Sequence, residues 1–313
     1  MNQYFVCREK CPACNSRRFS EVYRNPYDEP PVSTYLESFY SGKVELKYLR
    51  NASFCLCECE ECQLIFQKEI PNDHLMKVLY EEWIDPQTSY LSDQERDDQD
   101  LYWYYSQEIA AAIKFLGRMP SELEFFDFGM GWGKWALIAK GFGCDSFGAE
   151  LSEERINFAI SNGIKIVEWD DIPDHKFDFV NTEQVFEHIP DPYQTLCHLR
   201  KSLKPGGLLK VSVPTAADIS KRLKLMDWNA PKGSKNSLNA VAPLEHINCY
   251  KRQSLAKMAE EAGMEEVLMP MRIQYMYATN WSGPKKIAKN ILFPILRNVM
   301  KSKNYVFLRN KQP

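Results

Sequence analysis

The sequence contains no apolar run that approaches the ~20 residues needed to span a membrane. Its first ten residues also lack the apolar core of a secretory signal peptide. We therefore expect a cytoplasmic protein. No internal repeat is evident. The 313 residues, of which 44% are hydrophobic and 26% charged, are enough for one large or two modest globular domains. A chain of this length can bury a sizeable core, so its stability does not require disulfides.

Acidic residues are absent from Trp281 to the end of the chain, while the same segment carries eight basic residues. Since the net charge of the chain is −3, residues 1–280 carry −11. An acidic body argues against tight binding of nucleic acid over a broad surface, so we expect no nucleic-acid partner. The basic carboxyl-terminal segment is still compatible with a local anionic partner. The basic residues are Lys285, Lys286, Lys289, Arg297, Lys301, Lys303, Arg309 and Lys311.

Residues 285–303 of this basic segment also carry apolar residues at helical spacing. We expect a helix here that is interrupted at Pro294. Such a helix is suited to peripheral contact with an anionic membrane or to binding a glycan-assembly partner. The alternative is a solvated helix packed on the sheet. The apolar residues are Ile287, Ile291, Leu292, Ile295, Leu296, Val299 and Met300.

The cysteines are crowded toward the amino terminus, where seven of the ten precede residue 63. Two C-x2-C pairs, Cys11/Cys14 and Cys59/Cys62, are separated by 44 residues. In a reducing compartment, clustered cysteines indicate a metal site rather than a disulfide, and four thiolates complete the tetrahedral coordination of zinc. We expect a structural zinc in a zinc-ribbon module over residues 1–75. Cys57 is a competing ligand for Cys59. A redox role is the weaker interpretation, because neither pair opens a helix in a thioredoxin-like unit.

From residue 124 onward the pattern changes to strands that alternate with helices. This alternation predicts an α/β fold with a mostly parallel sheet covered on both faces. We place this domain at 119–313, ending in the basic helix and a closing strand, and a helical linker at 76–118. Strands are expected at 124–128, 146–150, 165–168, 177–181, 208–213, 266–269 and 305–308, and helices at 134–142, 153–162, 193–203 and 253–262.

A glycine-rich turn follows the first of these strands, with Asp127, Gly129, Gly131 and Gly133 in the pattern D-x-G-x-G-x-G. Glycines let the backbone turn tightly and approach a ligand closely. In open α/β sheets, ligands bind beyond the carboxyl ends of the strands. The dinucleotide fingerprint requires a glycine where Lys134 stands, so that interpretation fails locally. Taken alone, the turn could be only a tight connection.

Acidic residues follow the next two strands. Glu150 ends the second strand about 20 residues past the turn, where a carboxylate can accept hydrogen bonds from a ribose diol. Asp170 and Asp171 follow the third strand, where an acceptor could meet an adenine amino group. For each of these acids the alternative is a solvated loop position.

Together these segments resemble the class I S-adenosylmethionine-dependent methyltransferases. Residues 126–133, Phe-Asp-Phe-Gly-Met-Gly-Trp-Gly, look like their motif I, residues 177–180 their fourth strand, and residues 203–207 the turn before their fifth. The resemblance covers about residues 120–270 and the last strand. It implies a Rossmann-like seven-stranded sheet with an antiparallel last strand and S-adenosylmethionine as the cofactor, but says little about the substrate. The implied cofactor-binding residues are Asp127, Gly129, Gly131, Gly133, Glu150, Asp170, Asp171 and Glu183.

A Glu-His pair follows the fourth strand, in the segment that borders the cofactor and acceptor pocket in this family. His188 could take a proton from a hydroxyl that attacks the methyl group, with Glu187 either catalytic or holding the loop. His246, in a long polar loop after the fifth strand, is the second candidate base or a histidine that orders a lid. Some relatives bind a divalent ion through E-x-x-E-H. The positions of Glu183 and Gln184 depart from that spacing, which argues against a catalytic metal.

The cysteine-bearing residues 8–80 look like the zinc-ribbon start of sugar methyltransferases from bacterial glycan and antibiotic-sugar pathways. The sugar C-methyltransferases of that kind carry an extra carboxyl-terminal domain, for which 313 residues leave no room. The resemblance therefore favours O-methylation of a small-molecule or glycan acceptor, a nucleotide-linked sugar or a surface glycan, in polysaccharide biosynthesis. One alternative is an rRNA or tRNA methyltransferase whose zinc module grips RNA, although the second pair in such a family typically includes a histidine. The other is a non-catalytic adaptor that retains the cofactor fold.

Overall fold

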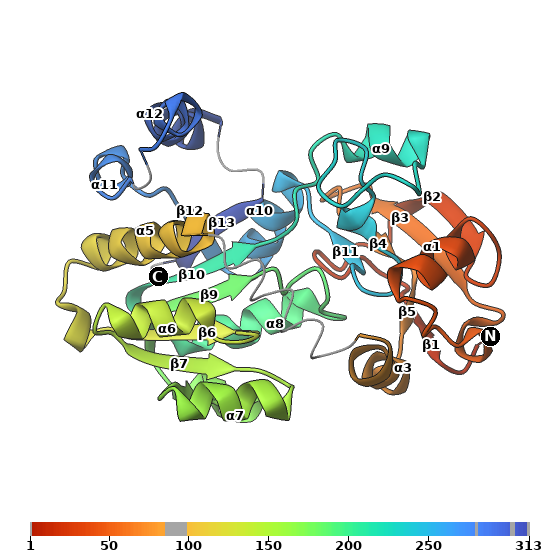
Figure 1. Cartoon of the computed structure of the whole chain (residues 1–313), viewed down its shortest axis with the longest axis horizontal. Helices are drawn as coiled ribbons and strands as arrows, with labels where there is room; N and C mark the ends of the chain where they lie inside the picture. The colour runs from red at the N-terminus through yellow and green to blue at the C-terminus, as the bar shows by residue number, and fades with distance from the viewer. Residues whose placement is uncertain (1, 85–98, 279–280, 301–303, 312–313) are drawn as a thin grey trace. The chain divides into compact units, whose positions relative to one another are not determined.

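The computed structural model describes residues 2–84, 99–278, 281–300 and 304–311, and the chain divides into two compact units (Figure 1). Unit 1 comprises Met1–Asp93, Phe186–Tyr193 and Val213–Met258, and unit 2 comprises Gln94–Val185, Gln194–Ser212 and Ala259–Pro313. The contiguous boundaries expected at residues 75 and 118 stay predictions, and residues 85–98 of the expected linker lie outside the described residues. Across the described residues, no helix is both long enough and apolar enough to cross a membrane.

Unit 2 is built around a seven-stranded sheet with the order β12-β13-β10-β9-β6-β7-β8. β13 pairs antiparallel with β10 and β12, and the remaining neighbours pair in parallel. This is the Rossmann-like α/β sheet with an antiparallel last strand that the sequence predicts. The strands are β6 (Glu124–Phe128), β7 (Asp145–Ala149), β8 (Lys165–Ile166), β9 (Phe177–Glu183), β10 (Leu203–Ser212), β12 (Met264–Val267) and β13 (Tyr305–Asn310).

The central strands of this sheet are rich in buried aromatic residues because both of their faces are covered. Phe126 stacks on Phe177 with ring centroids 4.6 Å apart, and Phe125 meets Phe179 at 5.3 Å. Helices α6 and α7 follow β6 and β7 and lie along the sheet (Figure 1). The helices are α5 (Gln99–Leu116), α6 (Lys134–Gly141), α7 (Glu153–Ser161), α8 (Pro192–Leu199), α10 (Arg252–Glu261), α11 (Met271–Met276) and α12 (Pro284–Met300), with short 3-10 turns at η2 (Pro120–Glu122), η3 (Trp169–Asp174) and η4 (Arg200–Ser202).

The order of the strands reverses between β6 and β9. The chain continues from β6 to β7 on one side, whereas β9, which comes later in the sequence, pairs with β6 on the other side. At such a switch point the connections leave adjacent strands in opposite directions and open a crevice at the carboxyl ends. The glycine turn, residues 129–133, leaves β6 at this place, and Glu183 ends the neighbouring β9.

Unit 1 contains a four-stranded antiparallel sheet with the order β11-β4-β3-β2 and a separate β1-β5 pair. Its core combines residues of strands, helices and turns, such as Phe54 of β3, Leu36 of α1 and the turn residues Tyr27 and Leu244, each fully buried. The elements are β1 (Phe5–Cys7), β2 (Phe19–Pro26), α1 (Val32–Phe39), α2 (Leu46–Leu49), β3 (Ser53–Cys59), β4 (Ile65–Gln67), β5 (Glu69–Pro71), α3 (Asp73–Val78), the π-helical η1 (Leu79–Trp83), α9 (Ile219–Leu225), η5 (Asn239–Val241) and β11 (Asn248–Cys249).

Helix α12 runs without a break through Pro294, so the predicted interruption there was wrong. A proline inside a helix removes one backbone N–H and therefore one hydrogen bond, and it bends a helix more readily than it ends it. The N–H that Pro294 lacks would bond the carbonyl of Asn290 one turn earlier, whereas the side-chain amide of Asn298 donates to the carbonyl of Pro294 itself, at 2.8 Å. Residues 301–303 of the expected helix lie outside the described residues.

Candidate functional site

The glycine turn after β6 has a backbone that only glycine adopts without strain. Gly129, Gly131 and Gly133 have φ values of 69°, 55° and 70°, in the left-handed region. At Gly129 a Cβ atom would also lie 2.7 Å from Cγ2 of Val185. The amides of Gly129 and Met130 donate to the carbonyl of Ala149 at 3.0 and 3.1 Å, which joins the turn to the end of β7. The turn is therefore a left-handed backbone segment that is joined to the end of β7 and has no room for a side chain at Gly129.

Glu150 follows the last residue of β7 and meets the glycine turn. One carboxylate oxygen accepts a hydrogen bond from the amide of Gly131 at 2.9 Å, and the other accepts from the amides of Leu151 and Ser152 at 2.8 and 3.2 Å. Arg155 lies 3.8 Å from the first oxygen. The structure thus brings together the acid and the turn that the sequence places about 20 residues apart.

Asp127 lies beneath the turn, inside the sheet. It is 3% exposed, and its carboxylate accepts a hydrogen bond from Nδ2 of Asn181 on the adjacent β9 at 2.8 Å. Burial raises the pKa of Asp127 to about 7, with the hydrogen bond from Asn181 opposing the rise. Asp127 can therefore fix the end of β6 and the start of the turn, but little of its surface is left for a ligand.

Glu183 belongs to a buried charge network that sequence reasoning missed. Nζ of Lys210, a completely buried side chain on β10, lies 2.5 Å from Glu183 and 2.7 Å from Glu108 of α5. The two carboxylates hold the pKa of Lys210 well above its ordinary value, against the lowering that burial causes. Ser212 and Trp135 donate to Glu183 and Glu108 at 2.9 and 3.0 Å. The signal in the sequence was a lysine within the mostly apolar residues 208–213, which include the second half of β10.

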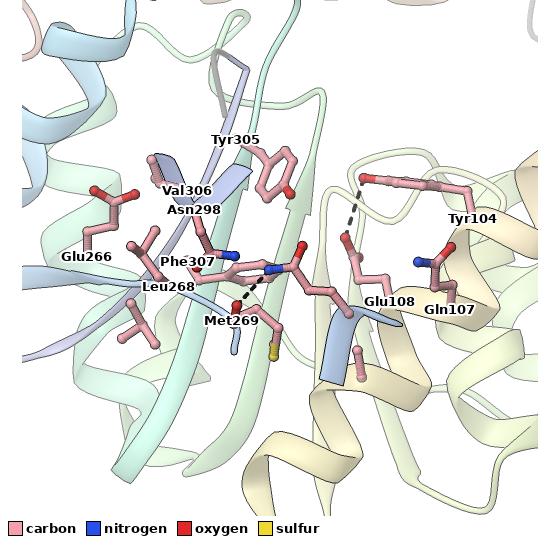
Figure 2. Close-up of a pocket in the computed structure, with 13 residues that line it drawn as sticks. Tyr104, Gln107, Glu108, Glu266, Leu268, Met269, Asn298, Tyr305, Val306 and Phe307 are labelled. Carbon is pink, nitrogen blue, oxygen red and sulfur yellow. Dashed lines mark hydrogen bonds between the residues drawn. The ribbon is translucent and has the colours of Figure 1, made fainter. Parts of the chain in front are cut away.

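A cavity lies beside Glu108, between α5, α11, α12 and the strands β12 and β13 (Figure 2). Figure 2 shows Tyr104 directed toward Glu108, to which its hydroxyl donates at 3.4 Å. The cavity also has an apolar lining from residues that include Met269 and Phe307. The cofactor residues predicted from the sequence do not line it. The cavity therefore belongs to the α11–α12 side of unit 2.

Asp170 and Asp171 lie in the 3-10 turn η3, and both are exposed to solvent. Their neighbour Trp169 is 44% exposed and stacks on His198 with ring centroids 4.0 Å apart. The Trp169 ring also lies 5.9 Å from that of Phe128, the last residue of β6. The turn η3 therefore reaches the carboxyl end of β6, where the glycine turn begins.

In unit 1, Glu187, His188 and His246 form one cluster whose possible ligand atoms all lie within 4.8 Å of one another. The two imidazole rings have centroids 4.9 Å apart, and Nε2 of His188 lies 3.8 Å from Oε1 of Glu187. Asn248 donates to the carbonyls of Phe186 and Ile189 at 3.0 and 2.7 Å, which fixes the loop that carries the first two residues. The three residues predicted as catalytic are thus close together.

Both histidines of this cluster are held in a defined state. Nδ1 of His188 lies 3.0 Å from the carbonyl of Glu245, and Nδ1 of His246 contacts the carbonyl of Asn239. A carbonyl only accepts, so each Nδ1 carries the hydrogen and each Nε2 is left as the basic atom. Burial lowers the pKa of His188 to about 4 and that of His246 to about 3, so both rings are neutral at pH 7. Neutral imidazole can accept a proton or bind a metal.

The four cysteines of the two C-x2-C pairs also meet in unit 1, with all sulfur atoms within 4.8 Å of one another. Cys11 lies 3.5 Å from Cys62, and Cys14 lies 3.6 Å from Cys59. These distances far exceed the ~2.05 Å of a disulfide and match the ~3.8 Å between sulfurs bound to one tetrahedral zinc. Cys57 is buried outside this group, so Cys59 is the member from that segment.

The two cysteine pairs have the same local backbone. The residues that follow them, Asn15 and Gln63, have φ values of 58° and 60°. In each case the amide of this residue donates to the carbonyl of the first cysteine, Cys11 at 2.9 Å and Cys59 at 3.0 Å. Each pair is therefore a tight knuckle that presents two sulfur atoms to one point.

The strand order, the glycine turn and Glu150 define the class I S-adenosylmethionine-dependent methyltransferase fold. A family model described as a methyltransferase domain matches residues 102–268, more than half of the chain. The chain belongs to this methyltransferase family, and it is an enzyme that uses S-adenosylmethionine.

The chain is similar to several proteins of this kind. It is 25% identical over 199 residues to a ubiquinone biosynthesis O-methyltransferase of Thiobacillus denitrificans, over 58% of this chain and 78% of that protein. The plantazolicin methyltransferase BpumL, solved with SAH, is 15% identical with a TM-score of 0.48, over 76% of this chain and 94% of that one. PKMT2 of Rickettsia typhi, in complex with AdoHcy, is 15% identical with a TM-score of 0.41, over 67% of this chain and about half (53%) of that one.

Proposed function

We propose that the protein transfers the methyl group of S-adenosylmethionine to a hydroxyl of a sugar, either nucleotide-linked or part of a surface glycan. The observation that supports O-methylation most directly is the pair of neutral imidazoles, His188 and His246, each with Nε2 as its basic atom. A sugar hydroxyl is a poor nucleophile until a base takes its proton. The name of the Thiobacillus denitrificans relative, an O-methyltransferase, agrees with this reaction type.

We infer that the cofactor lies against the glycine turn. The turn offers backbone without a Cβ at Gly129, where a side chain would collide, and Glu150 offers a carboxylate to the ribose hydroxyls. Asp170 and Asp171, exposed on η3, would accept from the adenine amino group. Asp127 and Glu183, one buried in the sheet and the other bound to Lys210, would act by fixing the ends of β6 and β9.

Calorimetric titration with S-adenosylmethionine tests this placement. Glu150→Gln keeps the shape of the side chain but removes the charge, and should weaken binding about 10- to 100-fold, the value of a hydrogen bond to a charged group. Glu153→Gln, at an exposed position three residues later, serves as the matched control and should bind as the wild type does. Equal affinities for all three proteins would refute the role of Glu150.

When bound, S-adenosylmethionine supplies an electrophilic methyl group on a sulfonium. The attacking hydroxyl must lie in line with the methyl–sulfur bond, so most of the protein's contribution is positioning. In the proposed mechanism, Nε2 of His188 or His246 takes the hydroxyl proton as the carbon–oxygen bond forms. Its Nδ1–H bond to a backbone carbonyl then stabilises the imidazolium. Glu187, 3.8 Å from His188, would stabilise the same positive charge.

The Glu187, His188 and His246 cluster also supports a second proposal, a divalent metal site. Two neutral imidazoles and one carboxylate are a known ligand set for such ions, and metal-binding histidines usually donate their other N–H to a carbonyl, as both do here. The three side chains would hold the ion, which would polarise the acceptor hydroxyl. Exhaustive dialysis against a chelator selective for weakly held divalent ions distinguishes the two proposals. Methyl transfer that survives this treatment would favour a histidine acting as the general base. Methyl transfer that is lost and then restored by Mg²⁺ or Mn²⁺ would favour the metal site.

We propose that Cys11, Cys14, Cys59 and Cys62 hold a structural zinc. The support is the geometry of the two knuckles, which places four sulfurs at the separations that tetrahedral zinc requires. Four thiolates leave no ligand position for water or substrate, so the ion would stabilise unit 1 without taking part in the reaction.

Radiolabelled S-adenosylmethionine, offered with nucleoside diphosphate sugars, surface-polysaccharide fragments or bulk RNA, tests the acceptor. We expect label in a sugar-containing acceptor, with kcat reduced about 10²- to 10⁴-fold in His188→Ala and His246→Ala and cofactor affinity unchanged. His74→Ala, at an exposed histidine of α3, is the matched control. Label in RNA alone, with RNA binding that weakens steeply as salt rises, would instead establish an RNA methyltransferase.

A further inference from the structure

Helix α12 carries its polar side chains toward unit 2. Among its described side chains, those that are partly or fully buried recur every four residues: Lys286, Asn290, Pro294 and Asn298. Lys286 pairs with Asp100 of α5 at 2.7 Å, and Asn298 lines the cavity of Figure 2. A helix that packs on its own domain normally buries an apolar stripe instead. The side chains that α12 packs against the rest of unit 2 are therefore mostly polar, with Pro294 as the one fully buried member of this set.

The rest of the α12 surface is largely apolar and exposed to solvent. Its large side chains are 39–76% exposed, and positions 287, 291, 295 and 299 recur at the four-residue spacing that forms one continuous stripe. Tyr275 of α11 donates to the carbonyl of Ile291 at 2.8 Å, which holds the two helices together on this side. The exposed apolar residues of α12 are Ile287, Ile291, Leu292, Phe293, Ile295, Leu296 and Val299.

Cations accompany this exposed stripe. Lys285 and Lys289 are exposed in the first turns of α12, and no acidic residue occurs from Trp281 to the end of the chain. The exposed Trp281 precedes the helix. An aliphatic arc flanked by lysines, with an aromatic residue at one end, fits the boundary between the headgroups and the acyl chains of an anionic lipid bilayer.

We propose that α12 is a membrane-surface helix that docks the enzyme on anionic lipid. A bilayer covers the aliphatic arc and neutralises the lysines at the same time. A second copy of the acidic chain would match the charge of the lysines, but it would also have to supply an apolar groove for the arc. Docking would bring the enzyme to acceptors carried on the membrane, and it does not depend on the identity of the acceptor or on the roles of the histidines.

Vesicle flotation of the full chain tests this proposal without substrate. The probes are vesicles of phosphatidylcholine with 30% phosphatidylglycerol and vesicles of phosphatidylcholine alone. We expect binding to the anionic vesicles and a blue shift of tryptophan emission. Lys285→Gln/Lys289→Gln should weaken binding about 25-fold, since each lysine near an anionic surface contributes about fivefold. Ile291→Ala/Leu292→Ala/Val299→Ala should weaken it about 100-fold or more, because eight carbons leave the bilayer.

Matched variants elsewhere on the surface separate docking from general loss of charge or apolar area. Lys224→Gln/Lys235→Gln removes the same charge, and Met119→Ala/Ile160→Ala/Leu225→Ala removes exposed apolar side chains of similar size. Both controls should bind as the wild type does. The proposal is overturned if no protein floats with anionic vesicles, or if the α12 variants and the controls bind alike. It is also overturned if sedimentation shows self-association that only the α12 apolar variant abolishes, because the face would then bind a second copy.

Discussion

At the scale of single residues, Gly129 is the position where the glycine turn tolerates least change. Gly129→Ala would combine a left-handed φ of 69° with a contact of 2.7 Å to Val185, whereas Gly131→Ala meets the same backbone penalty with open space around it. We expect Gly129→Ala to reduce the free energy of unfolding by about 1–3 kcal/mol more than Gly131→Ala does. Denaturant unfolding of both variants measures this difference, and equal losses would show that Val185 can move aside.

The histidine cluster gives a pH-dependent stability whose sign follows from burial. The pKa of His188 falls to about 4 and that of His246 to about 3, while in the unfolded chain both lie near 6.5. A group whose pKa is lowered by folding stabilises the native state fully above pH ~6.5, and that stability is lost as pH falls toward 4. The His188→Asn/His246→Gln variant should therefore lose less stability between pH 7 and 4.5 than the wild type. Parallel curves of unfolding free energy against pH would contradict the lowered pKa values.

The positions of the glycine turn and of Glu150 could be predicted because both depend on local sequence. The turn requires residues that adopt a left-handed backbone, and Glu150 is recognised as the residue at the end of a strand. The sequence could not reveal that Lys210 is paired, since its partners, Glu108 and Glu183, come from a distant helix and a neighbouring strand. The neutral state of His188 and His246 could not be predicted from the sequence either, because it depends on carbonyls supplied by other loops.

At the scale of secondary-structure elements, the two cysteine knuckles predict a metal-dependent unit 1. The protein should carry about one zinc per chain, and Cys11→Ser/Cys14→Ser should lose it and unfold at a lower temperature, because metal binding contributes folding free energy. Cys7→Ser/Cys197→Ser, which changes two cysteines outside the cluster, is the matched control. Elemental analysis and thermal unfolding measure both effects, and an undiminished metal content in the first variant would exclude these ligands.

Element positions in unit 2 followed from periodicity, and the strands β6 and β7 lie within one residue of their predicted ranges. The prediction failed at Pro294 because the loss of one backbone N–H bends a helix more readily than it ends it, and α12 continues through the proline. The short strands of unit 1 were not predicted, since strands such as β4 and β11 pair across more than 180 residues of sequence.

At the scale of the whole molecule, the chain passes between the two compact units several times. Residues 186–193 and 213–258 belong with the amino-terminal segment, although they follow strands of unit 2. Hydrophobic patterning reports whether a residue is buried but not which core buries it, so this division could not be read from the sequence.

The two units predict two separate responses to two ligands, which hydrogen exchange on the full chain can measure. S-adenosylhomocysteine, the product form of the cofactor, should slow amide exchange at residues 129–133 and 150–152, where the backbone lines the proposed site. A strong zinc chelator should speed exchange at residues 11–15 and 59–63, where the knuckle hydrogen bonds depend on the bound sulfurs. Each ligand should leave the other set of peptides unchanged, because each site is built within one unit. Chelation that alters the glycine turn as strongly as the knuckles would show that the zinc supports the cofactor site directly, against a purely structural role in unit 1.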